Sequence, residues 1–385
     1  MHYRLNRGPI MPWKEVTQMS SKLEFVLLAQ KQTQSFIELC RRFNISRKTG
    51  YKLVNRYKEE GAAGLEPRSS RPHSQPKLTS FQAQDKIIAL RKRKPSWGCR
   101  KIKAYLLNKG ELNLPAKSTI TDILHRHNLI KKNEYKKLPN PQRFEHAAPN
   151  DLWQADFKGH FAMQNGRCHP LTILDDHSRY SIGLQACDNE RGSTVKANFI
   201  KIFEKYGMPW RINFDNGTPW ASAHIRGFRY TEFSIWLVRL GIRVSFSKIR
   251  HPQTNGKDER FHRTLKVELL KDQYFKNTND AQRHFDRWRE EYNYERPHEA
   301  LNMQPPISRY SISERQYPVV LPDIEYPDCN LIRHVNKAGN ISIKNKKFFI
   351  SESLNQMPVA LREVENDKYN VYFCHQKILT LDLTK

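Results

Sequence analysis

Two stretches of this 385-residue chain are too rich in Pro, Gly, Ser and charged residues to belong to a hydrophobic core. They cover 61–77 (GAAGLEPRSSRPHSQPK) and the basic segment 131–148, and we interpret both as linkers. Because single cores stop growing at about 250–300 residues, a chain of this length should in any case contain several domains. The sequence predicts four: a helical domain at 1–60, a second helical domain at 78–130, an α/β domain at 149–310 and a small β domain at 328–385.

The charge of the chain points to a polyanionic partner. Lys and Arg total 66 against 39 Asp and Glu, a formal net charge of +27. Residues 1–150 hold 31 Lys and Arg against 11 acids, which gives +20 and leaves +7 for the remainder. Such an excess steers association with nucleic acid. There is no run of about 18 apolar residues, so we expect no membrane association.

The six cysteines do not suggest a zinc site or a disulfide framework. Neighbouring cysteines are at least 19 positions apart, and no CxxC pair occurs. We therefore expect reduced, buried thiols. The N-terminus does not have the charged, apolar and small-residue succession of a signal peptide, so we expect the protein to stay inside the cell.

The first helical domain has the pattern of a helix-turn-helix. Ser21 with Glu24 predicts a capped helix over 22–32, Ser35 begins a second helix, and a third is expected over 47–59 with Tyr51, Val54 and Tyr57 inward. The third helix is basic on its outer face, as a helix in the major groove would be. The alternative is a three-helix bundle with a solvated face. The expected DNA contacts are Arg47, Lys48, Thr49, Lys52 and Arg56.

A second helical unit follows the first linker. Thr79 with Gln82 predicts a helix start, and further helices are expected over 97–110 and from Ser118. Its basic side favours contacts to phosphates over reading of bases. A solvated run of charge is the alternative. The expected DNA contacts here are Arg93, Arg100 and Lys101.

From Leu152 the pattern changes to short alternating segments separated by turn signals. We expect three antiparallel strands, then a helix over 193–206, a strand over 211–215, a helix over 230–240 and a strand over 242–247, with a last helix from Thr254. This order predicts an α/β sheet with helices on both faces. The tail, 331–383, is strand-like, and a small β barrel fits its pattern best.

Three acids of the α/β domain could act together. Asp156 lies within a strand, Asp215 ends a strand, and Glu259 lies on the polar face of a helix. Each alone has an ordinary explanation: an exposed strand face, a hairpin turn and a surface helix. Together they could converge at one sheet edge and hold two Mg²⁺ or Mn²⁺ ions, which prefer oxygen ligands and promote displacement at phosphorus. The cations expected to hold DNA beside them are Arg260, His262, Arg263 and Lys266.

The blocks WQADFKG, TILDDHSRYSIG, FDNGTPW, KIRHPQTNGKDERFHRTLKVE and YNYERPHEAL resemble, in order, those of bacterial insertion-sequence DDE transposases with a retroviral-integrase-like core. The resemblance covers about residues 150–307. It implies an RNase H-like fold and assigns Asp156, Asp215 and Glu259 as the metal-binding catalytic triad. Asp215 and Glu259 are 44 positions apart, longer than the spacing often quoted, so the assignment rests on the motif around Glu259.

The resemblance also implies the reaction and the partners. It implies metal-dependent 3′-end cleavage and strand transfer, with helix-turn-helix modules that bind the terminal inverted repeats of a mobile element. Two element ends must be joined, so a homodimer or larger homo-oligomer on double-stranded DNA is expected, in the bacterial cytoplasm at the nucleoid. Retroviral integrases carry an N-terminal His and Cys zinc module, whose spacing this sequence does not have.

Other residues of the same blocks have simpler interpretations. Asp175 and Asp176 are read as turn residues that support the sheet, and Arg296 and His298 as structural. A loop before the Glu259 helix is expected to touch DNA through His251, Gln253, Asn255 and Lys257. Two rival functions remain open: a catalytically silent DNA-binding regulator derived from a transposase, and a nuclease acting on RNA in hybrids.

Overall fold

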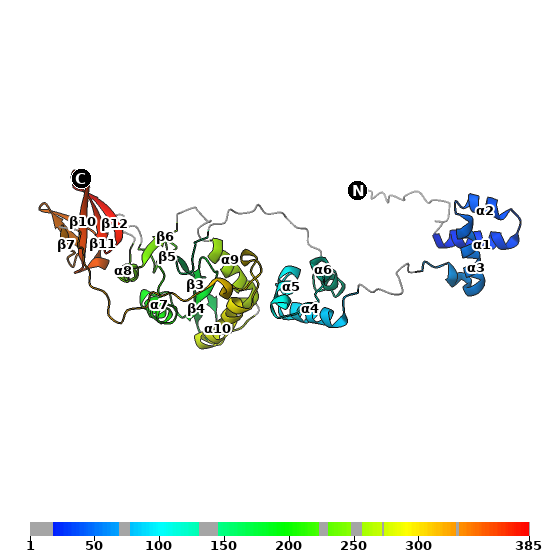
Figure 1. The fold of residues 1–385 in the computed structure, drawn as a ribbon, viewed down its shortest axis with the longest axis horizontal. Coiled ribbons are helices and arrows are strands. Elements are labelled where there is room, and N and C mark those ends of the chain that lie inside the picture. Colours follow the sequence, from blue (N-terminus) through cyan, green and yellow to red (C-terminus); the bar gives the residue numbers. More distant parts are fainter. Residues whose placement is uncertain are drawn as a thin grey trace, which may run out of the picture. The chain divides into compact units, whose positions relative to one another are not determined.

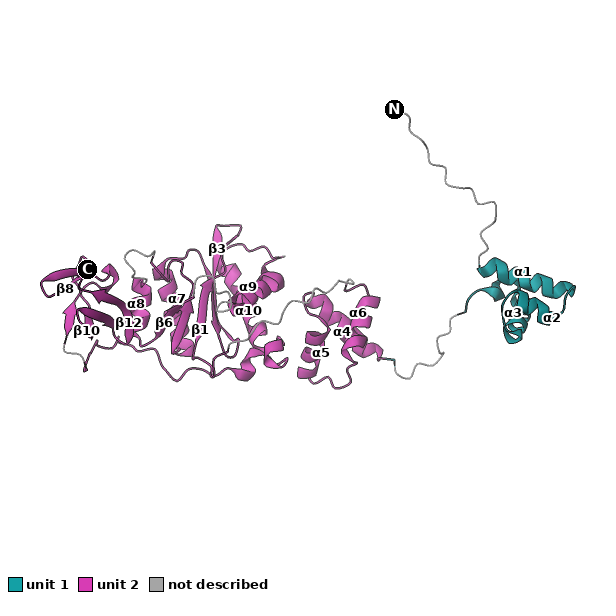
Figure 2. Ribbon diagram, turned by 90° about the horizontal axis from the view of Figure 1, so that it is seen from above, with its two compact units in different colours: residues 1–78 teal, residues 79–385 magenta. Residues whose placement is uncertain are grey.

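The computed structural model describes residues 18–68, 78–130, 145–222, 230–247, 256–271, 273–328 and 331–384. It divides into two compact units, residues 1–78 and 79–385 (Figure 2). Among the helices in the described ranges, none has the length and apolar character needed to cross a membrane.

The first unit is a small helical bundle with its own core. Its elements are α1 (Gln18–Lys31), α2 (Phe36–Arg42), α3 (Arg47–Glu60) and the 3₁₀ helix η1 (Gly61–Leu65). The Ser46 side chain caps α3 by accepting a hydrogen bond from the backbone N–H of Thr49. The buried core residues come from all four elements: Phe25, Val26, Leu39, Cys40, Leu53 and Leu65. The helical order is the expected one.

Three details of this unit differ from the prediction. Ser21 lies inside α1, which begins at Gln18, so the predicted capping box is wrong. Tyr51 is 56% exposed because Gly50 and Leu53 take the inward face of α3, and its ring stacks on Phe36 instead. The linker begins later than expected, because η1 packs Leu65 into the core.

The second unit begins with three more helices. They are α4 (Phe81–Arg93), α5 (Cys99–Asn108) and α6 (Lys117–Arg126), packed around Ile87, Trp97, Ile102 and Ile120. Ser80, not Thr79, caps α4, since its hydroxyl accepts the backbone N–H of Ala83.

A mixed sheet forms the centre of this unit (Figure 1). β1 (Trp153–Phe157), β3 (Arg167–Asp175) and β4 (Ser181–Cys187) form the expected antiparallel meander, with the short β2 (Phe161–Ala162) on β3. β5 (Arg211–Phe214) pairs parallel with β1, and β6 (Arg243–Phe246) pairs parallel with β5. The expected alternation of strand and helix is confirmed.

Helices cover both faces of the sheet, as predicted. On one face, α7 (Gly192–Tyr206) and α8 (Glu232–Arg239) pack on Trp153, Ala155, Leu171 and Ile173. On the other, α9 (Gly256–Leu265), the π helix η3 (Lys266–Leu270) and α10 (Thr278–Tyr294) pack on Leu174 and Leu184. The alternation of side chains along β3 and β4 therefore serves two separate cores.

Two 3₁₀ helices, η4 (Glu299–Leu301) and η5 (Pro306–Arg309), lead towards the tail. The tail contains β7 (Ile332–His334), β8 (Asn340–Ile343), β9 (Lys346–Phe349), the 3₁₀ helix η6 (Glu352–Leu354), β10 (Pro358–Glu365), β11 (Lys368–Phe373) and β12 (Gln376–Asp382). They form an open antiparallel sheet in the order β12-β11-β10-β7 and a separate β8–β9 hairpin. Within the described residues no closed barrel forms. The expected barrel is thus replaced by two sheets whose apolar side chains join the α7–α8 core.

Candidate active site

Two of the three predicted metal ligands lie side by side in the central sheet. Asp156 is on β1, whose register with parallel β5 pairs Gln154 with Asn213. Continuing that register by two residues brings Asp156 level with Asp215, directly after the end of β5. Parallel neighbours are about 4.8 Å apart and aligned side chains share a face, so the two carboxylates meet.

The negative charge of Asp215 acts on Asp156. Burial, then the charge of Asp215, raise the pKa of Asp156 to about 7. The carboxylate of Asp215 accepts the backbone N–H of Gly217 at 3.0 Å. A Cβ on Gly217 would lie 3.1 Å from Asp215 Oδ2, so glycine leaves room around this carboxylate.

Glu259, the third predicted ligand, is placed differently. It lies on α9, which packs against β1, but its side chain points to solvent while Asp258, Phe261 and Leu265 are buried. Within the described ranges, no three His, Cys, Asp or Glu side chains form a group that could hold a metal ion. The structure therefore brings Asp156 and Asp215 together and leaves Glu259 on the adjoining helix.

Asp258 is a residue that the sequence interpretation missed. It is 5% exposed, and burial, then the charges of Asp156 and Asp176, raise its pKa well above the ordinary range. Its Oδ1 has no hydrogen-bond partner. The available signal was its helical spacing to Phe261 and Leu265, three and seven positions on, which places Asp258 on the inward stripe.

The donor chemistry of this region fits a hard divalent cation. Oxygen ligands suit Mg²⁺ and Mn²⁺, and Asp156 and Asp215 repel each other unless a positive charge lies between them. The buried, unpaired oxygen of Asp258 adds a further acceptor close to Asp156.

The turn after β3 supports the sheet, as expected for Asp175. One of its carboxylate oxygens accepts the backbone N–H of Asn150 at 2.8 Å, and the other accepts the N–H and hydroxyl of Ser178 at 2.7 and 2.5 Å. Burial dominates over these bonds and raises its pKa. The Asp175 carboxylate therefore stabilises the turn through hydrogen bonds to Asn150 and Ser178.

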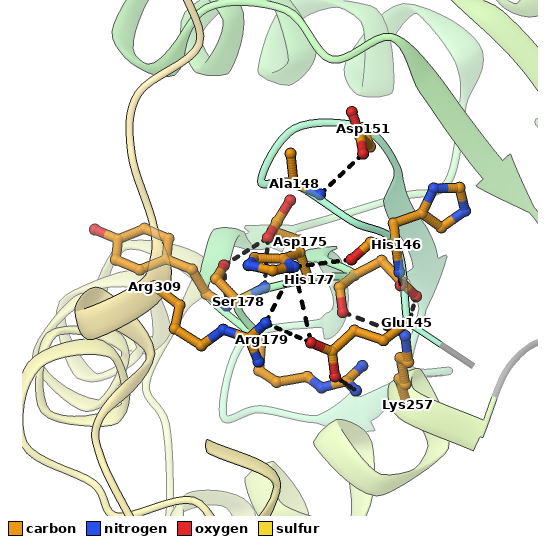
Figure 3. Close-up of polar contacts among 12 residues, drawn as sticks. Glu145, His146, Ala148, Asp151, Asp175, His177, Ser178, Arg179, Lys257 and Arg309 are labelled. Atoms are coloured by element: carbon orange, nitrogen blue, oxygen red, sulfur yellow. Dashed lines mark hydrogen bonds and ion pairs between the residues drawn. The ribbon is translucent and has the colours of Figure 1, made fainter. Parts of the chain in front are cut away.

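A network of charges surrounds this turn (Figure 3). Glu145, in the segment before β1, pairs with Arg309 of η5 at 2.6 Å and with Arg179 at 3.5 Å. His177 Nδ1 lies 2.8 Å from the backbone oxygen of His146. The network joins the entry to β1, the β3–β4 turn and η5.

The predicted DNA contacts of the first unit lie mainly at the surface. Arg47, Lys48, Thr49 and Lys52 are exposed on α3, and Arg56 is half-buried. The Thr49 hydroxyl lies 2.9 Å from that of Ser46. The face of α3 expected to enter the groove is therefore open.

Two of the three predicted contacts of the second helical unit are engaged with other protein groups, and the third, Lys101, is partly buried. Arg93 donates to the Tyr105 hydroxyl at 3.1 Å, and Arg100 pairs with Glu299 at 3.0 Å. Burial, followed by the charge of Arg296, lowers the pKa of Lys101 to about 8.

The cations of α9 divide into two groups. Arg260, Arg263 and Lys266 are exposed. His262 is mostly buried, its Nε2 lies 2.8 Å from Thr172 Oγ1, and burial lowers its pKa to about 4. It is therefore neutral at pH 7, and the expectation that it is a DNA-binding cation is wrong.

The loop before α9 is described only from Gly256 onward. Lys257 pairs with Asp176 at 2.5 Å, and burial lowers its pKa, so its charge is directed to the β3–β4 turn. His251, Gln253 and Asn255 lie outside the described residues.

Arg296 and His298 have the expected structural role. The guanidinium of Arg296 donates to both carboxylate oxygens of Glu268 at 3.0 to 3.1 Å. His298 lies 3.4 Å from Arg296, and burial lowers its pKa well below the ordinary range. These contacts join the end of α10 to η3.

The matches to known families follow this architecture. Residues 146–252 and 240–306 match two families described as integrase core domains. Residues 21–73 match a helix-turn-helix domain, and residues 49–124 a homeodomain-like domain. Helix-turn-helix domains followed by an integrase core define the class of protein that this chain resembles.

The similar proteins narrow this class. The chain is 31% identical to the insertion element IS136 protein of Agrobacterium fabrum over 153 residues, 38% of this chain and 75% of that protein. The chain belongs to this family of bacterial insertion-element proteins. It is also 26% identical to the transposase for insertion sequence element IS904 of Lactococcus lactis, over 43% of this chain and 63% of that protein. An insertion element IS407 protein of Burkholderia multivorans is 26% identical over 41% of this chain. The chain spans about half the length of that protein (54%) and of an insertion element IS476 protein of Xanthomonas euvesicatoria (50%).

Solved structures also align with the chain. A simian T-cell lymphotropic virus intasome chain has a TM-score of 0.37 at 18% identity, covering 74% of this chain and 91% of that one. The magnesium complex of the HTLV-2 integrase catalytic core has a TM-score of 0.32 at 17% identity, covering 42% and 97%. Both scores are below 0.5, so the fold assignment rests on the strand order and the sequence families.

Proposed function

We propose that this chain is the transposase of a mobile DNA element. It binds the terminal inverted repeats of the element, cleaves the DNA at its 3′ ends and transfers those ends into target DNA. The observation that carries the proposal is the meeting of Asp156, on β1, with Asp215, directly after the end of the parallel strand β5, where the pKa of Asp156 rises to about 7. Catalytic carboxylates that bind cations are expected to repel one another in this way.

In this proposal, Asp156, Asp215 and Glu259 hold two Mg²⁺ or Mn²⁺ ions. When bound, the ions would neutralise charge at the reacting phosphate and activate the attacking oxygen. Glu259 follows Asp258 on α9, which packs against β1, and its exposed side chain would turn towards Asp156 and Asp215 when the ions bind. The exposed Arg260, Arg263 and Lys266 would hold the DNA backbone along the same helix.

Two displacements at phosphorus make up the reaction. First, a water oxygen bonds to phosphorus at the element end, the P–O3′ bond breaks, and the leaving 3′ oxygen takes up a proton. Second, that 3′ hydroxyl loses its proton and attacks a target phosphate, the target P–O3′ bond breaks, and the leaving target 3′ oxygen takes up a proton. One phosphodiester bond forms for each one broken in the second step, so the joining needs no external energy source.

The helical domains would supply the DNA specificity. The exposed face of α3 would read the terminal repeat in the major groove, and the second helical unit would contribute phosphate contacts. Because two element ends must be joined together, the active species would be a homodimer or a larger homo-oligomer on DNA, acting at the bacterial nucleoid.

The test is cleavage and strand transfer on DNA that carries the repeats flanking the gene, with Mg²⁺ or Mn²⁺. We expect joined products from the wild type and from the control Glu204→Gln, whose side chain is exposed on α7. Asp156→Asn and Glu259→Gln should abolish the products while repeat binding is retained.

Two other outcomes would replace the proposal. Specific binding without cleavage by the wild type would identify a catalytically silent DNA-binding regulator. Cleavage of RNA in RNA–DNA hybrids, without any joining of DNA, would identify a nuclease.

A further inference from the structure

One buried carboxylate joins the strand of Asp156 to the helix of Glu259. Asp176 is 3% exposed. Its Oδ1 accepts a hydrogen bond from Gln154 Nε2 at 2.7 Å and pairs with Lys257 Nζ at 2.5 Å. Its Oδ2 accepts the backbone N–H of His146 at 2.9 Å. Both carboxylate oxygens of Asp176 are therefore engaged by neighbouring protein groups.

Two partners of Asp176 each lie two positions from a proposed metal ligand: Gln154 from Asp156, and Lys257 from Glu259. Gln154 is on the same face of β1 as Asp156, because side chains alternate along a strand. Lys257 is in the first turn of α9, two positions before Glu259. Asp176 thus has direct contact with both elements, although it lies on neither.

The position of Lys257 needs explanation, because a cation in the first turn of a helix is unfavourable. The positive end of the helix dipole repels it, and burying its ammonium carries a further cost. Lys257 Nζ also donates to the backbone oxygen of Asp176 at 3.2 Å, so two oxygens of one residue offset these costs. Lys257 would not be held inside the protein without Asp176.

The first turn of α9 has limited alternative support. Asp258, the next residue, is buried with its Oδ1 unpartnered, so it does not anchor the turn through that atom. Thr172 contacts the helix further on, at His262. Among the described contacts of this first turn, the Lys257–Asp176 pair is the charged connection to the sheet.

We propose that Asp176 is a positioning residue: through Lys257 it fixes the first turn of α9, so that Glu259 is presented to the edge where Asp156 and Asp215 meet. This inference rests on the proposed function for the role of Glu259. The contact itself does not depend on that function.

The experiment uses the full chain with Asp176→Asn, Lys257→Met and the double variant. Asp151→Asn is the matched control, because among the described contacts that carboxylate accepts the nearby backbone N–H of Ala148 at 3.0 Å (Figure 3). Hydrogen exchange of the α9 amides is measured without metal. Mn²⁺ affinity is measured by titration, and kcat and KM by strand transfer.

We expect faster amide exchange in α9 for both single variants and Mn²⁺ affinity about tenfold weaker, the usual effect of losing a residue that orients a ligand. The losses should not add in the double variant, because both substitutions break one contact. kcat should fall while KM for the repeat DNA stays unchanged. Lys257→Arg should restore part of the affinity.

Three results would overturn the inference. Unchanged exchange in α9 would show that the pair does not hold the helix, whatever the protein does. Faster exchange with unchanged Mn²⁺ affinity and kcat would show that the pair is only structural. A wild type that binds no Mn²⁺ and cuts no DNA would reject the proposed function, and the positioning role with it, while the exchange data would still report on the contact.

Discussion

The hydroxyl of Thr172, on β3, links the strand of Asp156, β1, to helix α9. Thr172 Oγ1 lies 2.9 Å from the backbone oxygen of Asp156 and 2.8 Å from His262 Nε2. A hydroxyl has one proton, so when it donates to the carbonyl of Asp156, Nε2 of His262 must be the donor to it. The bond therefore uses the neutral imidazole with its proton on Nε2.

This relationship predicts acid sensitivity. Burial lowers the pKa of His262 from 6.5 to about 4, so its contribution to stability is fully present above pH 6.5 and is lost as the pH falls towards 4. We expect His262→Gln to flatten the dependence of unfolding free energy on pH over this window, by up to about 3 kcal/mol. Denaturant unfolding at pH 7, 5.5 and 4 measures it. His127→Gln, at an exposed position, is the control. Parallel curves for wild type and His262→Gln would contradict the prediction.

The buried pair of Glu268 and Arg296 predicts strong non-additivity. Both side chains are 8% exposed, and Trp97 Nε1 donates to the same carboxylate at 3.2 Å. Arg296→Met should cost about 3–5 kcal/mol of unfolding free energy, because it leaves Glu268 buried without its counter-charge. Adding Glu268→Met should recover most of this loss, all but about 1 kcal/mol for the unpaired indole N–H.

Denaturant unfolding of the two single variants and the double variant provides the cycle. Lys344→Met serves as a control, since Lys344 and Asp367 form an ion pair at the surface and should leave the midpoint unchanged. Equal and additive losses from Arg296→Met and Glu268→Met would show that the pair is not a unit.

Gly50 predicts the sensitivity of the first unit to packing. A Cβ at this position would lie 2.8 Å from Cys40 Sγ and 3.0 Å from Phe25 Cζ. Gly50→Ala should therefore push α3 away from α1 and α2, at a cost of about 1–3 kcal/mol. Faster hydrogen exchange in α3 and weaker repeat binding would report it. Gly192→Ala, where a Cβ meets open space, should change neither.

The sequence predicted the elements of the core well because alternation and helical spacing are local signals. The meander, the two later strands and the two helical layers all follow from them. The β1–β5 register could not be read, because it depends on contacts between segments far apart in the chain. The burial of Asp258 was readable from its spacing to Phe261.

The other differences have similarly specific causes. Tyr51 was assigned inward by spacing alone, but Gly50 lets α3 approach its neighbours so closely that Leu53 fills the interior. The strand pattern of the tail fits an open sheet and a closed barrel equally well, so the sequence could not exclude the predicted barrel. Its apolar side chains instead join the α7–α8 core, which removes the need for closure. The partners of Arg100 and Lys257 lie far away in the sequence, so local charge could not reveal them.

The helical domain of α1–α3 and the helical domain of α4–α6 should differ in how they bind DNA. Lys48 and Lys52 are exposed on α3, whereas Arg100 is engaged with Glu299. Each of Lys48→Ala and Lys52→Ala should weaken repeat binding and reduce the slope of log affinity against log salt by about 1, since each phosphate contact releases counter-ions. Arg100→Ala should leave the slope unchanged, because its charge is already paired within the protein. Fluorescence anisotropy with labelled repeat DNA from low to moderate salt measures the three slopes against wild type. A drop of the slope in Arg100→Ala equal to that in Lys52→Ala would mean that DNA displaces Glu299 from Arg100. The helices α4–α6 would then contact phosphates with the same residues that contact the rest of the protein.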